Sequence, residues 1–142
     1  MNNIYQLFVY GSLRSGFKSP AFEYISCYFT FIANGKVKGI LYDMGEYPAA
    51  KLTEEKQYIV GELYAINNMD EFSFAMAQLD DYEGVIAEDG AEPLFKRETT
   101  TVYVGDKIVE AWIYWFNGNA NNKPIIESGD VLKYLEQKNS SL

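Results

Sequence analysis

Short runs of aromatic and β-branched residues recur along this chain of 142 residues, and turn-forming pairs separate them. Such runs favour strands, because branched and aromatic side chains pack well on a pleated surface. Strands are therefore expected over residues 4–10, 28–33, 36–44, 57–66, 95–104 and 107–116. Asn34-Gly35 and Gly105-Asp106 lie between consecutive runs, a pattern that predicts two β-hairpins.

Three segments carry helix signals instead. Pro20 suits the first position of a short helix. Asn68, followed three residues later by Glu71, resembles a capping box, and the helix that it starts is expected to end at Gly84. A last helix is expected over residues 131–138, after an N-capping aspartate.

Because strands outnumber helices in this pattern, the expected fold is α+β. It would be a small, mostly antiparallel β-barrel or strongly curved sheet with a few flanking helices. The length is that of one ordinary domain, so residues 1–142 are expected to form a single domain.

The balance of charge argues against several classes of partner. Twelve basic and 20 acidic residues give a net charge of −8. A phosphate-binding surface needs clustered Lys and Arg, so neither nucleic acid nor an anionic membrane is an expected partner. The chain does not open with a signal-like segment, and no apolar run is long enough for a membrane helix. A cytoplasmic location is expected. Cys27 is the single cysteine, so no internal disulfide is possible, and it is interpreted as a small core residue.

Histidine does not occur in the sequence. Without it, Ser-His-Asp and Cys-His nucleophile systems, histidine proton shuttles and nearly all zinc sites are excluded. Proton transfer would have to use Asp, Glu, Lys, Tyr or the single Cys.

Among the acidic residues, Glu83 has the most informative position. Side chains advance by about 100° per residue in a helix, and this places Glu83 on an apolar stripe. The stripe consists of Phe72, Ala75, Met76 and Leu79. Asp81 would point the opposite way and Asp80 would lie at the edge, so only Glu83 of these three is expected to face inward. Burial and the helix C-terminus would both raise the pKa of Glu83, as a general base at neutral pH requires. The alternative is that the last turn frays and Glu83 lies in solvent.

A strand that ends in Gly-Ser provides a second candidate site. In Tyr10-Gly11-Ser12-Leu13 the backbone N–H groups would be left unpaired, and such a nest binds a carboxylate or an oxyanion. An ordinary turn is the alternative. Tyr114 is expected on the same strand face as Trp112 and opposite to Trp115. Its hydroxyl could enter a pocket, although a place in the core is the plainer interpretation.

Five sequence blocks occur in a characteristic order. They are Phe8-Val9-Tyr10-Gly11-Ser12-Leu13-Arg14, Gly39-Ile40-Leu41-Tyr42-Asp43-Met44-Gly45, Tyr47-Pro48-Ala49, Val60-Gly61-Glu62-Leu63-Tyr64 and Leu79-Asp80-Asp81-Tyr82-Glu83-Gly84. Together they resemble the gamma-glutamyl cyclotransferase-like family, which includes gamma-glutamylamine cyclotransferases and avirulence-induced plant proteins. The resemblance extends from Phe8 to about Asp130.

This resemblance implies a transferase- or lyase-type reaction that releases 5-oxoproline and a free amine from a gamma-glutamyl amine or peptide. Glu83 would be the general acid/base, and residues 10–13 would form the substrate loop. No metal, cofactor or covalent enzyme intermediate is implied, because the substrate's own α-amine is the nucleophile. The expected partner is a small gamma-glutamyl substrate, and the protein is expected to be a monomer or a homodimer.

Two positions depart from the family pattern. Phe95-Lys96-Arg97 stands where the family usually has Tyr-x-Arg, and Val131 stands where a Trp usually follows Gly-Asp. Neither change removes the base or the loop. Two other functions stay open: a non-catalytic binding module for a small anionic metabolite on the same fold, and a protein-interaction domain with exposed aromatic residues. The sequence does not identify the leaving amine.

Overall fold

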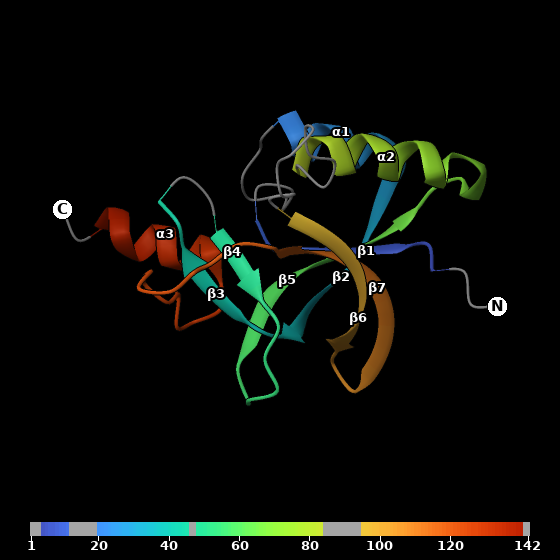
Figure 1. Cartoon of the computed structure of the whole chain (residues 1–142). Helices are drawn as coiled ribbons and strands as arrows, with labels where there is room; N and C mark the ends of the chain where they lie inside the picture. The colour runs from blue at the N-terminus through green and yellow to red at the C-terminus, as the bar shows by residue number, and fades with distance from the viewer. Residues whose placement is uncertain (1–3, 12–19, 46–47, 84–94, 141–142) are drawn as a thin grey trace.

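The computed structural model describes the backbone of residues 4–11, 20–45, 48–83 and 95–140 (Figure 1). Its elements, in chain order, are β1 (Gln6–Val9), α1 (Pro20–Tyr28), β2 (Phe29–Lys38), β3 (Ile40–Asp43), β4 (Pro48–Lys51), β5 (Tyr58–Ile66), the 3₁₀ turn η2 (Met69–Glu71), α2 (Phe72–Glu83), β6 (Phe95–Val104), β7 (Lys107–Phe116) and α3 (Val131–Ser140).

Within the described residues, five strands close into a barrel in the order β1-β5-β2-β6-β7. Neighbouring strands are antiparallel, except that β1 and β7 meet in parallel where Leu7 is opposite Trp112. Strands β3 and β4 form a separate two-stranded sheet. Helices α1 and α2 lie together over one side of the barrel, and α3 lies away from them near β3 and β4 (Figure 1). The prediction of an α+β fold with a small, mostly antiparallel barrel is confirmed.

One of the two predicted hairpins is wrong. Asn34 and Gly35 do not form a turn: they lie inside β2, opposite Glu62 and Gly61 of β5. A Cβ atom on Gly35 would stand 3.0 Å from Val102 Cγ1 and 3.1 Å from the Tyr103 carbonyl oxygen. Glycine is therefore used here for the close approach of β6, and not for a turn conformation.

The other local signals agree better with the structure. Strands β6 and β7 pair along their full length around the predicted turn, in which Gly105 has a φ of 59°. Helix α1 begins at Pro20 as predicted and continues to Tyr28. Cys27 therefore lies on a helix, where it is exposed, so its interpretation as a core residue is wrong. The Asp130 carboxylate accepts hydrogen bonds from the first turn of α3, which confirms the predicted N-cap.

Alternation along the strands produces two apolar clusters, one on each face of the barrel wall. The cluster with Phe8, Leu63 and Ile113 receives side chains from all five barrel strands and fills the interior. The cluster with Leu7, Val9 and Tyr114 receives side chains from α1 and α2, and so covers the outer face beneath these helices. As predicted, Trp112 and Tyr114 share one face, and Trp115 belongs to the other.

Candidate functional site

Helix α2, which ends at the candidate base Glu83, packs against the barrel. The Asn68 side chain accepts a hydrogen bond of 3.0 Å from the Asp70 N–H, and a 3₁₀ turn then leads into the helix. The predicted stripe packs on the barrel: Ala75, Met76 and Leu79 are all buried. Glu83 is the last residue of α2, and its side chain lies outside the described part of the structure, as does Gly84.

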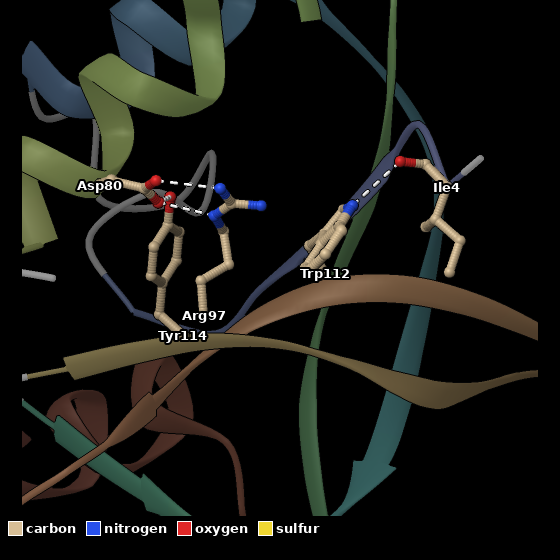
Figure 2. A network of polar contacts seen from close by, with 5 residues as sticks. All are labelled: Ile4, Asp80, Arg97, Trp112 and Tyr114. Carbon is tan, nitrogen blue, oxygen red and sulfur yellow. Dashed lines mark hydrogen bonds and ion pairs between the residues drawn. The ribbon is translucent and has the colours of Figure 1, made fainter. Parts of the chain in front are cut away.

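Asp80 faces the barrel, which the helical phasing did not predict (Figure 2). Its two carboxylate oxygens accept hydrogen bonds from Arg97, of 2.7 Å from Nε and 3.0 Å from Nη2. The Tyr114 hydroxyl donates a further hydrogen bond of 2.9 Å to Asp80 Oδ1. The expectation that only Glu83 of the three acidic residues faces inward is therefore wrong, while Asp81 is exposed as expected. Asp80 turns inward because a cation and a phenol on the barrel are within its reach.

Arg97 connects this carboxylate to the start of the chain. Its guanidinium lies over the Trp112 ring, 4.6 Å from the centroid, a distance at which cation–π attraction operates. The Trp112 indole N–H donates a hydrogen bond of 2.9 Å to the Ile4 carbonyl oxygen (Figure 2). Because Arg97 and Tyr114 are also cross-strand neighbours, one network links α2, β6, β7 and the segment before β1. The last turn of α2, which ends at Glu83, is thus held against the barrel.

Tyr10, at the end of β1, is joined to this network. Its side chain is buried, and its hydroxyl donates a hydrogen bond of 2.5 Å to the Tyr114 carbonyl oxygen. Gly11 follows against β4, where a Cβ atom would stand 3.3 Å from Pro48 Cγ. Ser12 and Leu13 lie outside the described residues, so the predicted anion-binding nest is not tested. The structure brings together Tyr10, Tyr114 and the helix that carries Glu83.

The sequence leaves two interpretations of Tyr114: a hydroxyl that enters a pocket and contacts substrate, or a place in the core. Tyr114 is buried, and its hydroxyl donates to Asp80. The plainer interpretation, a place in the core, agrees with its membership of the cluster beneath α2. Its contact with substrate stays a prediction.

Glu62 is a buried carboxylate that the sequence interpretation did not single out. It is 5% exposed, and it is the one buried charged side chain in the described part of the chain. It lies opposite Val9 in the β1–β5 pair and accepts a hydrogen bond of 2.8 Å from the Tyr64 hydroxyl. Alternation along β5 could have found it, because it places Glu62 on the same face as Tyr64. A buried carboxylate therefore lies beside the end of β1.

Residues 7–133 match the family described as "Gamma-glutamyl cyclotransferase, AIG2-like". The chain belongs to this family. The match includes the end of β1, the whole of α2 and the Asp80–Arg97 pair. Phe95, at the family's usual Tyr position, is buried and packs edge-on against Phe116, with 5.7 Å between ring centroids.

Solved structures share the fold. YkqA from Bacillus subtilis has a TM-score of 0.70 and 25% identity, and the match covers 95% of this chain but 42% of YkqA. The protein ytfP from Escherichia coli has a TM-score of 0.62 and 25% identity, with 91% of this chain and 97% of ytfP covered. An AIG2-like protein from Mus musculus has a TM-score of 0.67 and 21% identity, with coverages of 89% and 88%. No curated protein is significantly similar in sequence.

In the described segments, no helix is both long and apolar enough to span a membrane.

Proposed function

We propose that this protein is a gamma-glutamyl cyclotransferase that releases 5-oxoproline and a free amine from a gamma-glutamyl amine or peptide. The observation that carries the proposal is the family match over residues 7–133, which contains both the block with Tyr10–Leu13 and the block with Glu83. The hydrogen bonds from Tyr10 to Tyr114 and from Tyr114 to Asp80 support it, because they hold the ends of β1 and α2 together.

In the proposed reaction, Glu83 accepts a proton from the substrate's α-amine. The amine nitrogen attacks the γ-carbonyl carbon, and the five-membered ring closes. The bond from that carbon to the leaving nitrogen then breaks, and protonated Glu83 donates its proton to the departing amine. Backbone N–H groups of residues 10–13 hold the α-carboxylate or the developing oxyanion.

The proposed reaction requires few catalytic groups from the protein. Nucleophile and electrophile belong to one molecule, and intramolecular attack already has a high effective molarity. The protein must fold the substrate and move one proton, which a single carboxylate of raised pKa can do. A chain without histidine therefore has the groups that the reaction needs.

The test is Glu83→Gln, which keeps the shape of the side chain but cannot accept a proton at neutral pH. Turnover to 5-oxoproline should fall by roughly 10²–10⁴, the usual contribution of a positioned acid–base group. Asp81→Asn is the matched control, because Asp81 lies on the same helix and is exposed. Asp80→Asn does not serve as a control, because it would disturb the contacts to Arg97 and Tyr114.

Glu62→Gln tests the competing assignment. If Glu62→Gln abolishes turnover and Glu83→Gln retains it, the base is the buried carboxylate of β5 and the assignment to Glu83 is wrong. If wild-type protein binds 5-oxoproline but forms none from any gamma-glutamyl compound, the protein is a binding module for a small anionic metabolite.

A further inference from the structure

Two consecutive residues before β1 are connected to α2 by separate routes. The Tyr5 ring packs edge-on against the ring of Phe72, the first residue of α2, with 5.1 Å between the ring centroids. The Tyr5 carbonyl oxygen accepts a hydrogen bond of 3.1 Å from the Ile66 N–H at the end of β5. Tyr5 is thus tied to the barrel through its backbone and meets the start of α2 with its ring.

Ile4 is connected to the far end of the helix through a chain of side chains (Figure 2). Its carbonyl oxygen accepts the hydrogen bond of 2.9 Å from the Trp112 indole N–H. The Arg97 guanidinium lies over the Trp112 ring and donates two hydrogen bonds to the Asp80 carboxylate. Asp80 follows Phe72 by eight residues, so at 1.5 Å per residue the two points of attachment lie about 12 Å apart along α2. Two adjacent residues are therefore connected to two separate points on one helix.

These contacts fix the direction of α2, which apolar packing alone does not. Burial of apolar surface holds the helix on the barrel, but the hydrophobic effect is non-directional. Edge-to-face ring contacts and hydrogen bonds between charged groups depend on orientation, so they resist tilting and rotation of the helix. Glu83 follows Phe72 by eleven residues, or about 16 Å along the helix axis. A tilt of about 10° at Phe72 would therefore move the backbone of Glu83 by about 3 Å, and a displacement of about 1 Å can already cost about 10²-fold in rate.

We propose that the segment Ile4-Tyr5 positions α2 and, with it, the proposed base Glu83. Tyr5 and Trp112 are then positioning residues that act through the helix. The consequence for the reaction rests on the proposed function, because it assumes that Glu83 moves the proton. The hold on the helix does not rest on that assumption, because it consists of the contacts that end at Phe72 and Asp80.

The test compares Tyr5→Ala, which removes the ring contact to Phe72, with Tyr5→Phe, which keeps it. The assay uses a gamma-glutamyl compound that the wild-type protein turns over. In Tyr5→Ala we expect kcat to fall by about 10–100-fold because the base is displaced, while KM stays within about twofold because the Tyr10–Leu13 block is proposed to hold the substrate. In Tyr5→Phe both constants should stay within about twofold of wild type. Trp112→Phe, which removes the donor to Ile4, should also lower kcat and leave KM unchanged.

Tyr103→Ala is the matched control for Tyr5→Ala. Tyr103 makes a similar edge-on ring contact with Tyr58, at 5.9 Å between the centroids, but both of these residues belong to barrel strands. Tyr5 and Tyr103 are both partly exposed. Tyr103→Ala should therefore lower Tm as Tyr5→Ala does and leave kcat unchanged, when both are assayed well below Tm. If Tyr5→Ala retains the wild-type kcat, or if Tyr103→Ala lowers kcat equally, the positioning role is refuted.

Hydrogen exchange of the backbone amides of residues 79–83 separates this proposal from the proposed function. The measurement uses the intact protein without substrate. We expect faster exchange of these amides in Tyr5→Ala than in wild type, and no change in Tyr103→Ala. If this result comes with no 5-oxoproline from any gamma-glutamyl compound, the hold on α2 stands and the cyclotransferase assignment fails. If wild type forms 5-oxoproline and Tyr5→Ala changes neither exchange nor kcat, the positioning role fails and the cyclotransferase assignment stands.

Discussion

Breaking the pair between Asp80 and Arg97 should loosen α2 measurably. Arg97→Met keeps an apolar stem beside Trp112 but removes the guanidinium. The Asp80 carboxylate then keeps the Tyr114 hydroxyl as a partner and loses the two hydrogen bonds from Arg97. Asp80→Asn removes the charge and turns an amide group toward the Arg97 N–H donors. Both variants leave one half of the pair poorly matched, and the double variant removes both halves.

The expected magnitude follows from burial and geometry. Removing one partner of a fully buried pair costs about 3–5 kcal/mol. The side chains of Arg97 and Asp80 are 23% and 13% exposed, so some solvent screening remains. We therefore expect a loss of about 2–3 kcal/mol for Arg97→Met. An unfolding entropy of about 2.1 cal/mol/K per residue over 142 residues converts this loss to a decrease in Tm of about 7–10 °C.

The assay is a double-mutant cycle by urea and thermal unfolding. We expect a coupling free energy of about 1–2 kcal/mol between Asp80 and Arg97. The neighbouring pair Lys96–Glu98 provides the control cycle. Its atoms are 3.1 Å apart, but its side chains are 54% and 48% exposed, so its coupling should stay below about 0.5 kcal/mol. Equal couplings in the two cycles would refute the claim that the Asp80–Arg97 pair anchors α2.

Two further predictions concern stability. Gly129→Ala should cost about 3 kcal/mol or more, because φ is 69° and a Cβ atom would stand 1.9 Å from the Tyr58 carbonyl oxygen. Gly45→Ala, at a φ of 99° with open space around it, isolates the backbone strain and should cost about 1–2 kcal/mol; similar losses in urea unfolding would contradict the steric argument. Tyr134→Phe removes a hydrogen bond of 2.7 Å to Asp43 and should cost about 0.5–1 kcal/mol at neutral pH. That hydrogen bond raises the pKa of Tyr134 above its ordinary 10, so its contribution is complete below pH 10 and is lost as the pH rises through the folded-state pKa. The stability gap between wild type and Tyr134→Phe should therefore close at high pH, and a gap that widens would contradict the assignment.

The two glycine-containing dipeptides that predict hairpins have different structures, although their local sequence signals are similar. Gly105-Asp106 forms the predicted turn, and β6 and β7 pair with each other along their full length around it. Asn34-Gly35 carries an equally strong local signal, yet β2 continues through it and pairs with β5 from Phe29 to Lys38. Strand β2 also meets β6 at Lys36. Ladder hydrogen bonds to partners on both sides outweighed a turn preference of two residues, and nothing local to the pair reveals those partners.

The same distinction applies to the candidate site. The apolar stripe of α2 was predictable, because helical periodicity is set within one or two turns of the chain. The direction of Asp80 was not, because its partners Arg97 and Tyr114 follow it by 17 and 34 residues. A side chain at the edge of an apolar stripe can turn toward the barrel or toward solvent. Its direction depends on the charged groups within its reach.

The sequence by itself determined the chemistry that is available and the order of the family's blocks. A chain without histidine has to move protons with carboxylates, phenols, amines or its one thiol, whatever its fold. Closure of the barrel decided which of these groups meet: it buried Glu62 opposite Val9 and paired Asp80 with Arg97. Composition and periodicity are local properties of the chain. Contacts between distant side chains exist only once five strands have closed on one another, so only the tertiary structure could decide them.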